Sequence, residues 1–405
     1  MARATRLNSR VGAVDVASKF AGRGASLQGS EKIKRMADAP AYNPTLMSTL
    51  PTITQSATQN AANTRTVTYT DPAFQWPGFV DTAGGSATPR HYTRQDGSGV
   101  SAGVPTTQVA FDYDGQQFDA VFKAVVGMKY RVWVNERAAT AGMQSVTETG
   151  AVAYFNIDHG SASIGVPRRI VIELESPATP INFYGIRTPQ LATTIAPSIR
   201  SPRVMVIGDS YCGGAGATFF AYGYGRTLGR LMGWADCWTA YTSASSTGLV
   251  KDANSFSGRY ITRLTGDVIP NAPDLVIIQG SLNDNPYVGQ NLIGPALATY
   301  VNTLRAALPN VVIVVTSPLY VGDPPVSYTQ VRDEMAPVAA ALGVPFIDML
   351  TPKIFGGTGR VGATTGNGNA DVYRNNDNTH PVNESHHLIA TVLAGRISRV
   401  LGLAA

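Results

Sequence analysis

The chain has 405 residues, of which 44% are hydrophobic and 15% are charged, and it carries a net charge of +5. This length predicts two domains with cores of their own, and the composition excludes a fibrous or fully disordered protein. The longest apolar runs, such as Val311–Val315, are too short to cross a bilayer, and the N-terminal segment lacks the apolar core of a secretory signal. We therefore expect a cytoplasmic or virion-associated protein with no membrane partner.

Positive charge is concentrated at the N-terminus. Residues 1–35 hold eight Lys or Arg against two acidic residues, a net charge of +6, which leaves about −1 for the rest of the chain. A basic arm can touch nucleic acid, but it is more often a solvated tail or an assembly segment, which is the interpretation we favour. Residues 1–65 also lack sustained periodicity. We predict a flexible basic arm that serves in assembly or oligomerisation, and no nucleic-acid partner for the folded part.

Residues 66–190 are rich in short β-type runs separated by Gly, Asp and Pro. Several runs alternate in polarity and no helix-length segment intervenes, so this range predicts an antiparallel, jelly-roll-like β-sandwich domain. The predicted strands are Thr107–Tyr113, Phe118–Val125, Lys129–Asn135, Ala153–Ile157, Arg169–Glu175 and Ile181–Ile186. Some aromatic side chains in them are candidates either for the core or for stacking on a bound carbohydrate: Tyr113, Trp133, Tyr154 and Tyr184.

After a predicted linker at residues 191–202, strand-like and helix-like segments alternate over residues 203–405. The apolar strand candidates are Val204–Ile207, Leu275–Ile278, Val311–Val315 and Pro345–Ile347, and the helix candidates are Tyr222–Met232, Ala296–Leu308, Gln330–Leu342 and Glu384–Leu401. Near-continuous apolar strands are typical of a sheet buried on both faces. The pattern predicts an α/β domain, a flavodoxin-like parallel sheet with helices on both faces, which binds ligands beyond the carboxyl ends of its strands. Two cysteines, Cys212 and Cys237, fall at opposite ends of this sheet, too far apart for a disulfide.

Polar segments whose side chains could take part in a reaction fall at four of these predicted carboxyl ends. They are Gly208-Asp209-Ser210, the loop around Gly248, the pair Asn283-Asp284, and Asp377 with His380 before the last helix. Taken singly, each is equally consistent with a turn or a helix cap. Together they supply a serine hydroxyl, the base that it needs and a group to orient that base.

In this order the segments resemble the SGNH (GDSL-type) hydrolase family over about residues 200–405. Gly208-Asp209-Ser210 matches the first block and Asp377-Asn378-Thr379-His380-Pro381 the last, whereas Gly280-Ser281-Leu282-Asn283-Asp284 has one residue more than the commonest third block. Ser210 is then the nucleophile, His380 the general base and Asp377 its orienting group. The resemblance implies an oxyanion hole from the backbone N–H groups of Ser210 and Gly248 and the side-chain amide of Asn283. No metal or organic cofactor is implied, and His386 and His387 are predicted surface or supporting residues.

A β-sandwich ahead of such a domain resembles the arrangement of carbohydrate O-acetyl esterases, some of them on phage tails. We therefore predict a carboxylic ester hydrolase that removes small acyl groups, acetate above all, from an acylated polysaccharide. The Gly-rich segment 351–376 lacks the broad apolar surface suited to long acyl chains. Two alternatives stay open: a lipase, thioesterase or arylesterase with the same triad, and a virion or surface adhesion protein whose esterase domain is secondary or inactive.

Overall fold

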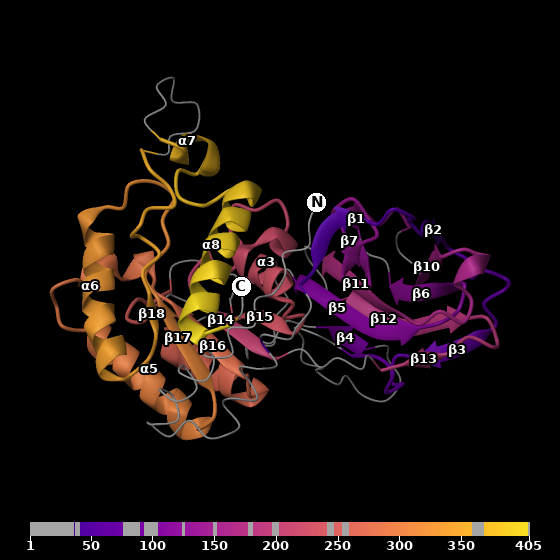
Figure 1. Ribbon diagram of the computed structural model, residues 1–405, viewed down its shortest axis with the longest axis horizontal. Helices are drawn as coiled ribbons and strands as arrows, with labels where there is room; N and C mark the ends of the chain where they lie inside the picture. The colour runs from indigo at the N-terminus through magenta and orange to yellow at the C-terminus, as the bar shows by residue number, and fades with distance from the viewer. Residues whose placement is uncertain are drawn as a thin grey trace. The chain divides into compact units, whose positions relative to one another are not determined.

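The computed structural model describes residue 36 and residues 41–75, 90–92, 104–123, 126–148, 152–176, 181–196, 202–240, 247–252, 259–358 and 368–403. The chain divides into two compact units, labelled by element in Figure 1. The sandwich unit comprises Ala41–Gln95 and Gly99–Arg200, and the α/β unit comprises Met1–Pro40, Asp96–Ser98 and Ser201–Ala405. The basic segment predicted over residues 1–35 lies outside the described residues.

Two largely antiparallel sheets make up the sandwich unit (Figure 1). Across one sheet the order is β1 (Asn43–Leu46), β8 (Arg137–Ala138), β7 (Lys129–Val134), β11 (Arg168–Ser176), β5 (Val104–Tyr113) and β13 (Thr194–Ile195), with β9 (Gln144–Ser145) beside β7. Across the other it is β2 (Thr52–Ser56), β10 (Val152–Asp158), β6 (Gln117–Lys123), β12 (Ile181–Thr188) and β3 (Arg65–Thr68), with β4 (Arg90–Tyr92) beside β12.

The core of the sandwich unit is aromatic. Alternate residues of strands from both sheets are fully buried in one cluster, among them Phe111, Phe118, Phe122, Phe155 and Phe183. Their rings meet edge-on or tilted, as in the contact of Phe111 with Phe118 at 5.3 Å between centroids. The antiparallel pairing of β10 with β6, of β6 with β12 and of β11 with β5 and β7 confirms the antiparallel sandwich expected from the sequence.

Two parts of the sandwich unit differ from expectation. β1 and β2 lie within residues 1–65, so the prediction of a flexible arm is wrong for that part, and β13 lies within the predicted linker 191–202. These strands are short and largely exposed; β1 has no buried residue, so no alternation marks it in the sequence. Of the aromatic candidates, Tyr113 and Trp133 are buried, whereas Tyr154 and Tyr184 are half-buried.

A five-stranded parallel sheet forms the centre of the α/β unit. Its order is β15 (Cys237–Ala240), β14 (Val204–Ile207), β16 (Leu275–Gln279), β17 (Val312–Thr316) and β18 (Phe346–Ile347). Numbered along the chain this is the order 2-1-3-4-5, which is that of flavodoxin-like folds and confirms the prediction. The order reverses between β14 and β16, and ligands bind such sheets at this reversal.

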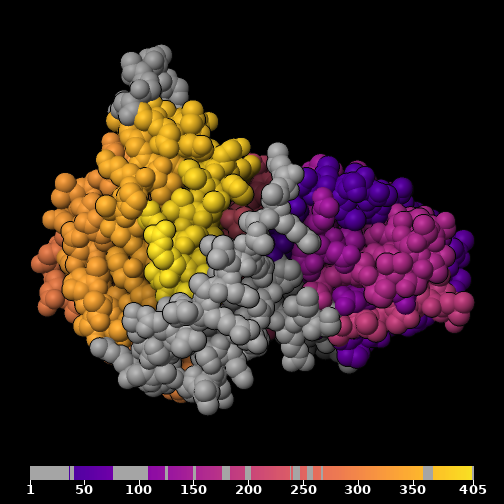
Figure 2. All heavy atoms as spheres, viewed as in Figure 1, coloured from indigo at the N-terminus to yellow at the C-terminus, as the bar shows by residue number. Residues whose placement is uncertain are grey.

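Helices cover both faces of the sheet: α3 (Tyr224–Met232) and α8 (Asn383–Leu401) pack together, as do α5 (Ile293–Ala307) and α6 (Val326–Ala341) (Figure 1). Val204 and Val206 of β14 join Leu228 of α3 and Leu393 of α8 in one buried cluster. The shorter helices are α4 (Tyr260–Arg263), α7 (Ala370–Tyr373), η2 (Phe220–Tyr222) and η3 to η5 (Leu264–Val268, Ile269–Asn271 and Leu282–Tyr287). The outer side of α8 is exposed and appears in yellow in Figure 2.

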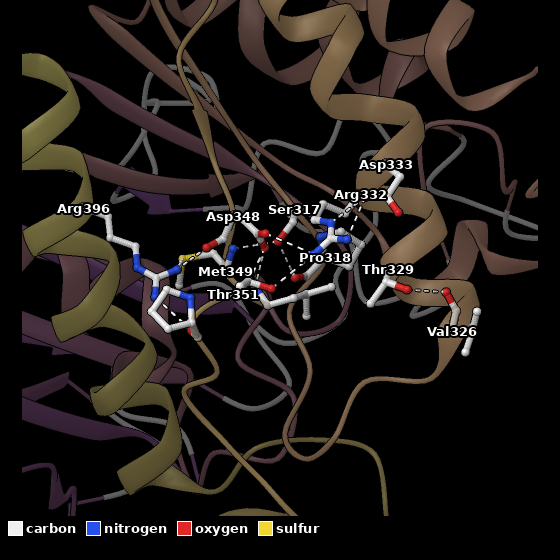
Figure 3. Close-up of polar contacts among 12 residues, drawn as sticks. Ser317, Pro318, Val326, Thr329, Arg332, Asp333, Asp348, Met349, Thr351 and Arg396 are labelled. Atoms are coloured by element: carbon white, nitrogen blue, oxygen red, sulfur yellow. Dashed lines mark hydrogen bonds and ion pairs between the residues drawn. The ribbon is translucent and has the colours of Figure 1, made fainter.

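A polar cluster beyond the carboxyl ends of β17 and β18 ties both helix layers to the segment that follows the sheet (Figure 3). Asp348 forms an ion pair with Arg332 of α6, at 3.2 Å between Oδ2 and Nη1. Arg396 of α8 donates to the carbonyl oxygens of Asp348 and Pro352. The start of segment 351–376 is thereby fixed, although residues 359–367 within it lie outside the described part of the chain.

Candidate active site

Strand β14 brings Ser210 to the carboxyl end of the sheet. All four strand residues are buried, and the strand is followed by Gly208, where a Cβ atom would lie 2.4 Å from Gln279 Oε1. Glycine is required by this close approach, and the chain turns directly after it. Ser210 is only 4% exposed and follows β14, beside the reversal of strand order where such sheets bind ligands.

Asp209 anchors the turn that carries Ser210. Its buried carboxylate accepts hydrogen bonds from the backbone N–H groups of Tyr211 at 3.1 Å and Leu282 at 3.2 Å, and from the Gln279 amide at 2.9 Å. Burial raises the pKa of this carboxyl group, while the hydrogen bonds counteract the rise. A carboxylate so enclosed is suited to hold the turn in place rather than to react.

His380 lies between Ser210 and Asp377 in a hydrogen-bonded row. Its Nε2 atom is 2.8 Å from Ser210 Oγ, and its Nδ1 atom is 2.5 Å from Asp377 Oδ2. The second carboxylate oxygen accepts the backbone N–H groups of Thr379 and His380, each at 2.9 Å. Partial burial raises the pKa of Asp377, but these hydrogen bonds outweigh it and hold the pKa below its ordinary value. An ionised Asp377 keeps a proton on Nδ1, which leaves Nε2 to accept the Ser210 hydroxyl.

The turn that presents Asp377 and His380 is itself fixed at several points. The Asn375 N–H donates to the His380 carbonyl at 2.7 Å, and Asn378 adopts a left-handed conformation with φ of 57°. The hydroxyl of Tyr211, next to the serine, donates to the Thr379 carbonyl at 2.6 Å. The turn that carries Ser210 and the turn that carries His380 are thus joined directly, although they are far apart in the sequence.

Two of the three expected oxyanion donors, Asn283 and Gly248, already donate a hydrogen bond within the protein. Asn283 Nδ2 donates to the Thr247 carbonyl at 3.2 Å, a contact that uses one of its two N–H bonds and orients the amide. The Gly248 N–H donates to the Lys251 carbonyl at 3.0 Å. This single N–H would have to exchange that partner before it could bind an oxyanion beside Ser210. The role expected of Gly248 therefore stays a prediction.

Asp284 organises a neighbouring loop, a role that the sequence did not predict for it. Its buried carboxylate accepts three successive backbone N–H groups, from Leu249 at 2.8 Å, Val250 at 3.0 Å and Lys251 at 2.8 Å. A Cβ atom on Gly248 would lie 2.3 Å from Asp284 Oδ1, so only glycine fits beside this carboxylate. Burial raises the pKa of Asp284 to about 6. An acidic residue directly after Asn283 was the available signal, but its partners lie on another loop.

Ser281, one of the two residues between Gly280 and Asn283, connects three parts of the site. Its buried hydroxyl lies 2.8 Å from the Thr247 carbonyl and 3.1 Å from Asp209 Oδ2, and it accepts the Asn283 N–H at 3.0 Å. The neighbouring Gly280 is also required, because a Cβ atom there would lie 2.8 Å from the backbone nitrogen of Pro318. Ser281 therefore links the turn that carries Ser210 to the loop that carries Gly248.

The two remaining histidines of the last helix differ in burial, whereas both cysteines are buried. His387 is exposed on α8, whereas His386 is completely buried and belongs to the interior of the α/β unit. Cys212 and Cys237 are both buried and free. Within the described residues, no group of three or more His, Cys, Asp or Glu side chains is arranged to hold a metal ion. In the same part of the chain, no helix is both long and apolar enough to span a membrane.

Residues 206–388 match the model of the GDSL-like lipase/acylhydrolase family. No curated protein has a sequence that matches this chain. Several solved structures are similar. Salicylyl-acyltransferase SsfX3 from a tetracycline biosynthetic pathway is 16% identical with a TM-score of 0.56, and the match covers 82% of this chain and 96% of that one.

Two carbohydrate esterases are similar to the same extent. A family two carbohydrate esterase from Clostridium thermocellum, in complex with cellohexaose, is 15% identical with a TM-score of 0.54, over 82% of this chain and 99% of that one. The acetyl xylan esterase Est2A from the rumen bacterium Butyrivibrio proteoclasticus is 13% identical with a TM-score of 0.54, over 88% and 100%. At these identities the likeness shows a shared fold.

Proposed function

We propose, from the premise that residues 206–388 are a GDSL-like lipase/acylhydrolase domain, that this protein is a serine esterase that removes small acyl groups, acetate above all, from a polysaccharide. The observation that carries the proposal is the hydrogen-bonded row of Ser210, His380 and Asp377. A serine next to a neutral imidazole acceptor, with a carboxylate on the far ring nitrogen, is the arrangement that acyl transfer through serine needs.

The first half of the reaction forms an acyl-enzyme. Ser210 Oγ attacks the ester carbonyl carbon while its proton passes to His380 Nε2, and the carbonyl oxygen takes the displaced electron pair as an oxyanion. When the tetrahedral intermediate collapses, the C–O bond to the sugar breaks and His380 gives the proton to the leaving alkoxide. Asp377 stabilises the imidazolium in between. The products of this half are a free sugar hydroxyl and acyl-Ser210.

In the second half, water takes the place of the sugar. His380 accepts a proton from the water as its oxygen attacks acyl-Ser210, and the collapse of the second intermediate returns that proton to Ser210 and releases acetic acid, which gives its proton to solvent. The Ser210 N–H and the Asn283 amide are the donors that we assign to the oxyanion, with Gly248 as a third if its bond to Lys251 opens. Each such donor typically contributes about 3–4 kcal/mol to transition-state stabilisation.

The carbohydrate part of the proposal has separate support. Several similar solved structures are named as carbohydrate esterases, one as an acetyl xylan esterase and one in complex with cellohexaose. The match covers nearly the whole length of those chains, so the likeness includes a β-rich unit as well as the hydrolase domain. We extend to this chain the expectation of an acylated carbohydrate as substrate.

Release of acetate from acetylated glycans tests this function. We would incubate the purified full chain with acetylated xylan, acetylated pectin and O-acetylated bacterial glycans and measure free acetate over time. The expected result is turnover of at least one glycan, with a loss of 10³-fold or more in Ser210→Ala, since that variant retains only substrate binding and the oxyanion donors. Turnover that persists in Ser210→Ala would show that Ser210 is not the nucleophile.

A chain-length series separates the alternatives with the same triad. With nitrophenyl esters from acetate to palmitate, the proposal predicts the highest kcat/KM for acetate and a steep fall with chain length. Faster cleavage of long-chain esters or of acyl thioesters than of any acetylated glycan would indicate a lipase or thioesterase instead. The Ser210→Ala variant serves as the blank in every arm.

A further inference from the structure

The buried imidazole of His386 has no role in the reaction described so far. It is 0% exposed and lies in the first turn of α8. Its Nε2 atom is 3.1 Å from the carbonyl oxygen of Ala215, and its Nδ1 atom is 3.2 Å from the backbone nitrogen of Tyr224, the first residue of α3. The ring stacks parallel to the Tyr224 ring, with 6.5 Å between centroids. A titratable side chain is thus held on both nitrogens inside the unit.

The two backbone partners of His386 fix its protonation state. A carbonyl oxygen only accepts hydrogen bonds and a backbone N–H only donates them. Nε2 must therefore carry the proton toward Ala215, and Nδ1 must keep its lone pair toward Tyr224. In a charged imidazolium the Nδ1–H group would point at the Tyr224 N–H group, and two hydrogen-bond donors would face each other. Burial, with the nearby His380, lowers the pKa of His386 to about 4, which favours the neutral ring.

Ala215 belongs to a turn that contacts the backbone of Ser210 and the side chain of His380. This turn, residues 211–217, follows the nucleophile, and the Ala215 N–H donates to the Ser210 carbonyl at 3.0 Å. The adjacent Gly216 has a φ of 89°, and a Cβ atom there would lie 2.8 Å from His380 Cβ. The backbone of the turn is therefore in close contact with the base as well as with the nucleophile.

We propose that His386 is a positioning residue: its Nε2–H bond to Ala215 holds the turn 211–217 and so sets the distance between Ser210 Oγ and His380 Nε2. The inference rests on the proposed function, because it assigns His386 to the same site. His386 touches no reacting atom and acts through Ala215. A misplacement of about 1 Å between reacting groups is enough to lower a rate by about 100-fold, so one buried hydrogen bond at this place is sufficient to matter.

The Nδ1 bond has a separate, structural role. The residue before α3 is Gly223, which has no side chain to cap the helix, and the imidazole of His386 supplies an acceptor for the Tyr224 N–H instead. Two substitutions divide the roles. The amide of His386→Asn lies where Nδ1 lies and keeps an acceptor for Tyr224, whereas the longer His386→Gln reaches the place of Nε2 and keeps a donor for Ala215.

Kinetics of the two variants give opposite expectations. For His386→Asn we expect kcat to fall about 10- to 100-fold with KM within about threefold, because binding groups are untouched. For His386→Gln we expect kcat within about threefold of the wild type but a lower Tm, because the cap of α3 is lost. Rates are expressed per active site titrated with a serine-reactive phosphonate, so that a fraction of misfolded protein does not count as a slow enzyme. His387→Asn, one residue away and exposed, is the matched control.

Hydrogen exchange tests the positioning without relying on catalysis. In His386→Asn, amides of the peptide spanning residues 211–217 should exchange at least tenfold faster than in the wild type, whereas His386→Gln and His387→Asn should leave them unchanged. If the wild type lacked Ser210-dependent activity, the proposed function would fail, yet this measurement would still decide whether His386 holds the turn. Equal kcat values in the Asn and Gln variants, or unchanged exchange in both, would overturn the proposal.

A measurement on the wild type covers the case in which His386→Asn does not fold. Long-range ¹H–¹⁵N spectra of the full chain, which has only five histidines, report the tautomer of each ring. His386 should show the neutral Nε2–H form at pH 7. A neutral Nδ1–H form or a charged ring would contradict the bond to Ala215 and end the proposal.

Discussion

The carboxylate of Asp377 works through both of its oxygens. Oδ2 faces His380 Nδ1, while Oδ1 accepts two backbone N–H groups of its own turn. The side chain is 45% exposed, so solvent reduces its purely electrostatic contribution. Its principal effect on His380 is therefore geometric: it selects the Nδ1–H tautomer and the orientation of the ring. The Asn and Ala variants of Asp377 are therefore expected to differ in their effect on the tautomer of His380.

Asp377→Asn should be at least as harmful as Asp377→Ala. An amide can turn its NH₂ group toward Nδ1, which makes that nitrogen an acceptor and leaves Nε2 protonated and unable to accept the Ser210 proton. We expect kcat to fall by about 10²- to 10⁴-fold in the Asn variant, with KM little changed. Steady-state kinetics with nitrophenyl acetate provide the measurement. A loss of less than threefold in both variants would show that His380 needs no orienting group.

The parts of the site differ in how far a single sequence predicts them. Ser210, Asp377 and His380 could be placed together because each falls beside a predicted strand end or helix start in a recognisable short motif. The three N–H contacts of Asp284 and the burial of His386 could not be predicted, since they depend on which loops become neighbours in space. Short-range sequence patterns reveal motifs at the ends of strands and helices, but they do not reveal which loops contact each other.

At the scale of elements, the loop 247–252 is organised by η5 rather than by its own sequence. Three backbone N–H groups converge on the carboxylate of Asp284, and the Thr247 carbonyl accepts from Ser281 and Asn283. Successive N–H groups around one anion form a compact nest that holds a loop firmly. The position of Gly248 beside the site therefore depends on a side chain from the neighbouring strand end.

Asp284→Asn tests whether this loop takes part in catalysis. An amide offers one acceptor where the carboxylate offers two, and its NH₂ group opposes a backbone donor, so we expect the loop 247–252 to lose one of its three bonds to residue 284. We also expect kcat per titrated active site to fall about tenfold or more if Gly248 contributes to the oxyanion hole. Asp333→Asn on the surface of α6 is the control. An unchanged kcat would confine the loop to a structural role.

For the whole molecule, the α/β unit was easier to predict than the sandwich unit. Strands buried on both faces have an unbroken apolar sequence, as over Leu275–Ile278 of β16, so the parallel sheet and its helices are evident. In the sandwich unit the exposed edge strands β1, β2 and β13 lack that signal, and they fell in the predicted arm and linker. Edge strands are held by partners distant in sequence, so a local window does not reveal them.

Two buried groups of the α/β unit give its stability opposite pH dependences. His386 has a pKa lowered to about 4, so its contribution is complete above the unfolded value of about 6.5 and is lost as the pH falls toward 4. Asp284 has a pKa raised to about 6, so its contribution is complete below about 4 and is lost as the pH rises through 6. Between pH 4 and 6 the two effects offset each other, so the wild-type profile alone does not reveal either one.

The difference between variant and wild type isolates the histidine. We expect the Tm of His386→Asn to lie below that of the wild type at pH 7, and the gap to shrink as the pH falls to 4.5, because only the wild type must keep a buried ring neutral. The change amounts to at most about 1.4 kcal/mol per pH unit. The groups that face the ring, Tyr224 on α3 and His380 on the preceding turn, are present in both proteins and largely cancel. Calorimetry of the full chains at several pH values provides the measurement, with His387→Asn as the control. A difference in Tm that stays constant with pH would mean that His386 is not a neutral, buried group.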